Sequence, residues 1–96
     1  MYERLQHEDP AVRIQAAVEA AENRDRESVS LLIDRLEDPN ADVRFFSWIA
    51  LRKITGTSHG WNYYDPPEKR SQAVERWRQW LSNTSEVVHE KGTGAE

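Results

Sequence analysis

The chain has 96 residues and no cysteine, with 38% hydrophobic and 31% charged residues. These values are typical of one soluble globular domain and exclude disulfide bonds and thiolate metal sites. No apolar run approaches the roughly 18 to 20 residues of a membrane span, and the charged N-terminus lacks the apolar core of a secretion signal, so we expect a cytoplasmic protein that does not enter a membrane.

The net charge of −4 is unevenly distributed along the chain. Residues 1–43 contain five arginines and eleven acidic residues, whereas residues 44–81 contain seven basic and three acidic residues. Such an asymmetry can orient neighbouring modules or steer a charged partner. Solvated helix faces with uneven charge are the simpler interpretation.

The first half of the chain predicts two helices. Asp9 is a suitable N-cap and Pro10 suits the first helical position, where its missing N–H costs nothing. A short polar turn at 23–26 separates the two helices. Each helix carries an apolar stripe at helical spacing, formed by Val12, Ala16, Ala17 and Ala20 in the first and by Val29, Leu32, Ile33 and Leu36 in the second.

A third helix follows Asn40, which is its predicted cap. The dipeptide Val12-Arg13 recurs 31 residues later as Val43-Arg44, and several further positions match at the same offset. A run of matches at one spacing indicates a duplicated helix pair. The inner face of the third helix is expected to hold Val43, Phe46, Ser47, Ala50, Leu51 and Ile54.

A long loop over 55–66 precedes the last helix. Asp65 can cap that helix, Pro66 suits its first position, and Glu68 completes a capping box. Its apolar stripe consists of Val74, Trp77 and Leu81, with Ala73 and Trp80 beside them. We therefore expect a domain over 1–81 and a flexible tail over 82–96, which has no periodicity.

The stretches "DPAVRIQAA" and "LEDPNADVRFFSWIAL" resemble the HEAT repeat, in particular its short bacterial form, which also occurs in bilin-lyase-like proteins. The resemblance covers residues 5–81. It implies an all-α, HEAT-like, right-handed α-solenoid of about two antiparallel helix-pair repeats. The residues themselves add to this fold an aromatic loop before the last helix and a disordered C-terminal tail. The resemblance also implies that Arg13 and Arg44 bridge neighbouring repeats.

The residues offer no catalytic or metal-binding set. Some HEAT-repeat proteins are di-iron hydroxylases with His-Glu pairs after the Val-Arg dipeptide, but this chain has Ile14-Gln15 and Phe45-Phe46 there. Three scattered histidines without cysteine make no ligand set. Ser58 and His59 are adjacent, yet no nucleophile-elbow motif surrounds the serine. We expect no enzyme activity, no metal and no cofactor.

The aromatic loop has two interpretations, because a long loop in a small domain is usually functional or packed as a plug. A solenoid must cover its terminal apolar face. Trp61, with Trp77 and Trp80, is the predicted structural cap. Tyr63 and Tyr64 are the predicted recognition residues, since tyrosine is enriched in binding hot spots.

The favoured function is a non-catalytic protein–protein interaction or scaffold module. Its expected contact surface is a groove around Arg35, Arg70 and Arg78 with Tyr63 and Tyr64 at the edge, and the identity of the partner protein stays open. Self-association also stays open, because an uncovered solenoid end is an apolar surface that a second copy could bind. The alternative is binding of nucleic acid or phosphate through the basic C-terminal half, with Arg52, Lys53, Lys69, Arg70, Arg76 and Arg78.

Overall fold

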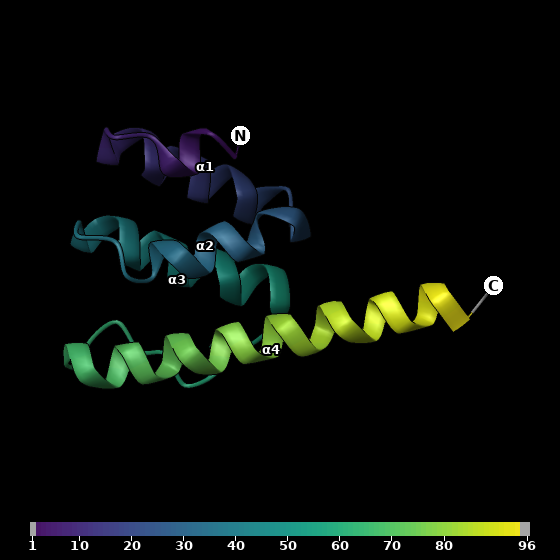
Figure 1. The fold of residues 1–96 in the computed structure, drawn as a ribbon. Coiled ribbons are helices and arrows are strands. Elements are labelled where there is room, and N and C mark those ends of the chain that lie inside the picture. Colours follow the sequence, from purple (N-terminus) through teal and green to yellow (C-terminus); the bar gives the residue numbers. More distant parts are fainter. Residues whose placement is uncertain (1, 95–96) are drawn as a thin grey trace.

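The computed structural model describes the backbone of residues 2–94 and the side chains of residues 2–84. Within the described backbone there is no strand, which confirms the predicted all-α class. Figure 1 shows the helices in chain order. They are the short 3₁₀ helices η1 (Arg4–Gln6) and η2 (Arg26–Ser28) and the α-helices α1 (Pro10–Glu22), α2 (Val29–Arg35), α3 (Ala41–Thr55) and α4 (Pro67–Gly94).

The first and third helices begin at the caps that the sequence predicts. The Asp9 side chain accepts a hydrogen bond from the backbone N–H of Ala11 at 2.9 Å. Asn40 accepts from the N–H groups of Asp42 and Val43 at 2.9 and 3.1 Å. Each cap satisfies donors that the first helical turn would otherwise leave unpaired. Both helices therefore start where local sequence places them.

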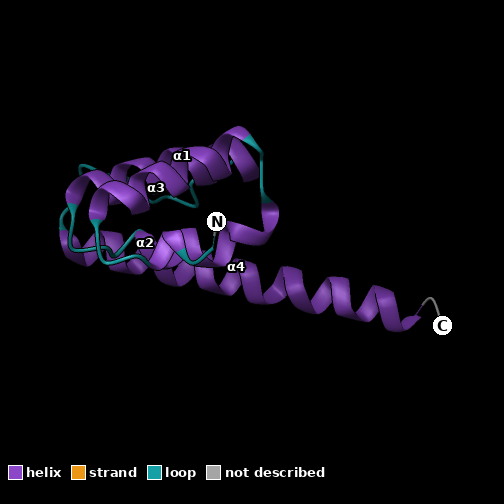
Figure 2. Cartoon of the chain, turned by 90° about the horizontal axis from the view of Figure 1, so that it is seen from above, coloured by secondary structure: helices purple, strands orange, loops and turns teal. Residues whose placement is uncertain are grey.

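The helices form two layers, with α1 beside α3 in one and α2 beside α4 in the other (Figure 2). The small side chains of Ala16, Ala17 and Ala20 are fully buried in α1 and allow close approach of the neighbouring helices. Removal of this apolar surface from water is the main favourable contribution to folding. The other aliphatic residues of the core are Leu5, Ala21, Val29, Leu32, Ile33, Leu36, Val43, Ala50, Leu51, Ile54, Ala73 and Val74.

The last two helices differ from the expected antiparallel arrangement. Helices α1 and α2 run in opposite directions, but α3 and α4 run in the same direction (Figure 1). The aromatic loop makes this possible because it returns along α3. Trp61 lies beside Trp48 with ring centroids 5.7 Å apart, and Tyr63 lies beside Phe45, nearer the start of α3, at 5.3 Å.

The length of the loop follows from this path. Helix α3 has 15 residues, so its axis is about 22 Å long. A turn of the kind found after α1 could not return the chain over that distance. The residues between α3 and α4, 56–66, can extend to roughly 36 Å. The long connection is thus required by the direction of α4.

Helix α4 also continues beyond the predicted end near Leu81, because it runs to Gly94. No proline follows Pro67 and no glycine precedes Gly92 in this stretch. Extension of an existing helix adds a hydrogen bond for each residue fixed, so the helix propagates without an apolar stripe. Residues 95–96 of the predicted tail lie outside the described backbone.

Candidate functional site

The aromatic loop buries Trp61, which is only 1% exposed and belongs to the hydrophobic core. Trp77 of α4 is fully buried, and Trp80 packs against the same core with part of its surface accessible. The His59 ring contacts both α4 tryptophans, with centroid distances of 4.5 Å to Trp77 and 5.2 Å to Trp80. The loop and α4 are therefore joined through aromatic packing.

A tight turn at His59 and Gly60 holds the loop on α4. Both residues have positive φ, of 49° and 78°. The Arg76 Nε donates a hydrogen bond to the His59 carbonyl at 3.0 Å, and a Cβ at Gly60 would lie 2.7 Å from Arg76 Nη2. Burial of the ring, with a further contribution from the Arg76 charge, lowers the pKa of His59 below its ordinary value of 6.5. The imidazole is therefore neutral at pH 7.

Outside this packed region, four rings form a continuous row, called here the aromatic row: Phe46, Phe45, Tyr63 and Tyr64. Successive rings meet edge to face at 5.4, 5.3 and 5.2 Å. Tyr63 packs partly against the core, whereas Tyr64 is 81% exposed and Phe46 is 36% exposed. The row thus begins and ends in accessible rings and is anchored in the middle.

The exposure of Phe46 corrects its predicted place on the inner face of α3. Val43, Ser47 and Ala50 are fully buried, and these positions define the direction that faces the core. At about 100° per residue, Phe46 lies at the margin of this stripe rather than at its centre. Phe45 and Phe46 therefore belong to the aromatic row, although the sequence analysis predicted only Tyr63 and Tyr64 as recognition residues. Their proximity to Tyr63 depends on the path of the loop.

Basic side chains border the other end of the loop. Trp48 stacks nearly parallel to Tyr63, at 6.5 Å and 12°. The Arg52 guanidinium lies 5.2 Å from the centre of the Trp48 ring, a cation–π distance. Arg52, Lys53, Ile49 and Gly56 line an open depression of about 340 Å³. None of the described residues that line this depression carries a carboxylate.

The three arginines predicted to share one groove have different surroundings. Arg35 Nη1 lies 3.5 Å from the Asp38 carboxylate and donates to the Leu5 carbonyl at 3.4 Å. Arg78 of α4 pairs with Asp34 of α2 at 3.5 Å and with Glu37, just after α2, at 3.0 Å. Arg35 and Arg78 therefore take part in ion pairs within the fold.

Arg70 instead lies in a cleft between the end of α2 and the start of α4. Its Nη1 donates to the Asp65 carbonyl at 2.9 Å. The cleft has a volume of about 180 Å³ and also contains Arg44, which is absent from the predicted site. Its lining consists of Leu36, Glu37, Asp38, Arg44, Pro67, Arg70 and Ser71.

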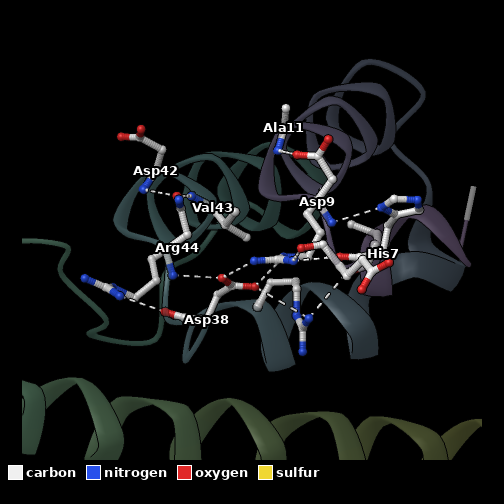
Figure 3. Close-up of polar contacts among 12 residues, drawn as sticks. His7, Asp9, Ala11, Asp38, Asp42, Val43 and Arg44 are labelled. Atoms are coloured by element: carbon white, nitrogen blue, oxygen red, sulfur yellow. Dashed lines mark hydrogen bonds and ion pairs between the residues drawn. The ribbon is translucent and has the colours of Figure 1, made fainter.

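Asp38 is the centre of the polar contacts that join the helices near this cleft (Figure 3). Its buried carboxylate contacts Arg13 of α1, with Nε 2.8 Å from Oδ2 and Nη2 2.9 Å from Oδ1. Its backbone carbonyl accepts from Arg44 Nη1 of α3 at 2.7 Å. Arg13 and Arg44 thus connect successive helix pairs to the same turn.

Among residues 2–84, no group of three or more histidine or acidic side chains is placed to hold a metal ion. No helix in the described part of the chain combines the length and hydropathy needed to cross a membrane.

Comparison with known proteins identifies a family for residues 1–60 of the 96. A family model described as HEAT repeats matches residues 1–60. No curated protein and no solved structure matches the chain. The family match includes α1, α2 and α3 and ends within the aromatic loop, before the start of α4. The reversed helix therefore lies beyond the matched repeat unit.

Proposed function

Because this chain belongs to the HEAT-repeat family, whose members generally serve as protein-interaction scaffolds, we propose that it binds a partner protein through the aromatic row without catalysing a reaction. The α1–α2 pair and α3 supply the rigid support. The loop between α3 and α4 supplies two of the four rings.

The observation that carries this proposal is the exposure of Tyr64, which is 81% accessible at the end of the row. The loop buries Trp61 almost completely but leaves this neighbouring ring in solvent. Large exposed aromatic side chains beside one another are typical of binding surfaces, and tyrosine is enriched among residues that dominate binding energy.

The row is also held in place before a partner arrives. Tyr63 contacts Phe45 on one side and stacks on Trp48 on the other. Both Tyr63 and Trp48 pack against the buried core. A surface whose rings are already fixed loses less conformational entropy on binding, which favours affinity. The proposed structural cap, formed by Trp61, Trp77 and Trp80, would provide this rigidity.

The test compares partner capture from native lysate by the wild type, Tyr64→Ala and Phe46→Ala. Val18→Ala is the matched control, because Val18 is an exposed apolar residue of α1, 37% accessible, outside the row. Circular dichroism first verifies that all variants retain wild-type helix content. We expect a protein that wild type and Val18→Ala retain and that both row variants lose. Equal capture by all four chains would contradict the proposal.

The same experiment separates the alternative of nucleic-acid binding. Retention of nucleic acid that weakens steeply with salt, and that is insensitive to Tyr64→Ala, would favour phosphate contacts over the aromatic row. In the structure, three of the basic residues of the C-terminal half already have intramolecular partners. Arg70 donates to the Asp65 carbonyl, Arg76 donates to the His59 carbonyl and Arg78 pairs with Glu37. Sedimentation of the purified chain distinguishes self-association from binding of another protein.

A further inference from the structure

The two arginines that recur at the 31-residue offset have the same local geometry. Arg13 Nη1 donates to the carbonyl of His7, six residues earlier, at 2.6 Å. Arg44 Nη1 donates to the carbonyl of Asp38, also six residues earlier, at 2.7 Å. The two side chains therefore start from matching positions in the first and second repeats.

The two arginines differ in the partners of their other guanidinium nitrogens. Arg13 also binds the Asp38 carboxylate with two of its nitrogens. Among the described side chains, Arg44 has no carboxylate partner. Its Nε is buried and, like the Nε atoms of Arg13 and Arg35, has no hydrogen-bond partner among the described residues. The missing carboxylate is therefore what distinguishes Arg44 from Arg13. A guanidinium that lines a cleft and has no carboxylate counter-ion favours an anionic ligand, because charge-assisted hydrogen bonds are among the strongest polar contacts.

The reversed direction of α4 explains the difference. In the first repeat, the turn after α2 brings an aspartate to Arg13. In the second repeat, the start of α4 lies at this end of the molecule, and it brings Arg70 and Ser71 to the cleft beside Arg44. The cleft beside Arg44 thus contains a second arginine, whereas Arg13 lies against a carboxylate.

We propose that the cleft between the end of α2 and the start of α4 binds an aspartate or glutamate carboxylate of a partner protein through Arg44 and Arg70. This inference rests on the proposed function in that the acidic segment belongs to a protein partner. It does not depend on the aromatic row. Guanidinium groups recognise carboxylates by charge-assisted hydrogen bonds. Arg13 makes one such bond to Asp38, from Nη2 to Oδ1, and its Nε adds an ion-pair contact with Oδ2.

The acidic residues that line the cleft do not neutralise these two arginines. The Asp38 carboxylate is shared by Arg13 and Arg35, and Glu37 lies 3.0 Å from Arg78. The cleft, at about 180 Å³, is large enough for a carboxylate side chain but small for an extended ligand. An acidic side chain that enters from a larger partner fits both its charge and its size.

The first repeat itself suggests the probe. Asp38 lies in the sequence EDPNA, residues 37–41, and this segment supplies the carboxylate that Arg13 binds. We would titrate the acetylated, amidated pentapeptide EDPNA into the full chain and follow the arginine side-chain Nε–H resonances by NMR. The neutral peptide QNPNA is the matched control. Inorganic phosphate is the third ligand, because it tests for an anion site of different chemistry.

We expect saturable shifts of the Arg44 and Arg70 resonances with EDPNA and none with QNPNA. Arg70→Gln should weaken EDPNA binding at least about tenfold, because it removes charge-assisted hydrogen bonds. Arg52→Gln is the control for charge, since Arg52 lies over Trp48 outside the cleft, and it should leave peptide binding unchanged. Arg44→Lys keeps the charge but removes the planar fork, and it should also weaken binding.

Absence of shifts, or equal shifts with both peptides, would overturn the proposal. Shifts with phosphate alone would overturn it as well, because they would identify a phosphate site. Tyr64→Ala should leave the EDPNA titration unchanged. A failed partner capture together with an intact titration would therefore reject the aromatic row alone, and the reverse result would reject the carboxylate site alone.

Discussion

The Arg13 guanidinium of α1 and the Asp38 carboxylate of the turn between α2 and α3 form a buried ion pair, with Nε 2.8 Å from Oδ2. Asp38 is 2% exposed and Arg13 is 8% exposed. The carboxylate also accepts from the backbone N–H of Asn40 at 2.9 Å. One side chain thereby connects the first repeat to the start of the second.

Replacement of this carboxylate should destabilise the fold strongly. Asp38→Asn leaves the Arg13 charge buried without its counter-ion, and loss of one partner of a buried pair costs about 3–5 kcal/mol. The carbonyls of His7 and Glu8 still accept from Arg13, so we expect a value near the lower end. Urea denaturation followed by circular dichroism measures it. The control Glu8→Gln, at an exposed acid nearby, should change the free energy of unfolding by less than about 0.5 kcal/mol.

Truncation of the buried loop tryptophan is a test of the proposed structural cap. Trp61→Ala removes a ring that is 1% exposed and should lower the free energy of unfolding by about 3–5 kcal/mol, as large-to-small changes in a core do. Tyr64→Ala, three residues later and mostly in solvent, should cost less than about 0.5 kcal/mol. Chemical denaturation of both variants gives the comparison. Similar values for the two would show that the loop does not act as a plug.

Acidification should destabilise the fold through His59. Burial of the ring and the Arg76 charge lower its folded-state pKa, while its unfolded-state pKa stays near 6.5. Above pH 6.5 both states are neutral and the effect is absent. Below it, the unfolded state binds the proton first, so stability falls until the pH passes the folded-state pKa. His59→Asn tolerates the same positive φ and should remove this part of the pH dependence. The measurement is the denaturation midpoint of both proteins from pH 7.5 to 5. If the midpoints of wild type and His59→Asn change in parallel with pH, His59 does not contribute to the pH dependence.

Removal of residues 85–96 should have little effect on stability. In the described part of α4, the residues that pack against the core are Ala73, Val74, Trp77, Trp80 and Leu81. Ser82, Asn83 and Thr84 are exposed, and the end of α4 projects beyond the other helices (Figure 1). A chain ending at Thr84 should keep its free energy of unfolding within about 0.5 kcal/mol of wild type. A larger loss would place the boundary of the folded unit after residue 84 and not near Leu81.

The helices themselves could be predicted because their signals are local. Asp9 and Asn40 accept hydrogen bonds from N–H groups two or three residues ahead, which depends only on neighbouring residues. The apolar stripes of α1 and α2 and the repeat of Val-Arg at 31 residues identify the HEAT-repeat pairs before any packing is known. The end of α4 was less predictable, since a helix without a breaker continues where its apolar stripe stops.

The candidate site could not be predicted from the sequence, because it depends on which of the two recurring arginines has a carboxylate partner in the fold. The sequence pointed to Arg70 but not to Arg44, because both recurring arginines look alike in a linear comparison. Only the structure shows that Arg13 has a carboxylate while Arg44 shares a cleft with Arg70. In the same way, Tyr63 and Tyr64 could be selected from the loop, whereas Phe45 and Phe46 join them only through contacts across the fold.

The sequence by itself determined the order of the helices, the caps of α1 and α3 and the repeated pair, because each depends on residues within a few turns of one another. It did not determine the bounds of α4, which begins at Pro67, one residue after the predicted first position, and runs to Gly94. The tertiary structure decided the direction of α4, and with it the aromatic row and the arginine cleft. An apolar stripe such as that of Val74 and Trp77 can be buried by a helix running either way. The choice depends on whether Trp61 and Tyr63 pack along Trp48 and Phe45, which is a non-local contact that no short stretch of sequence encodes.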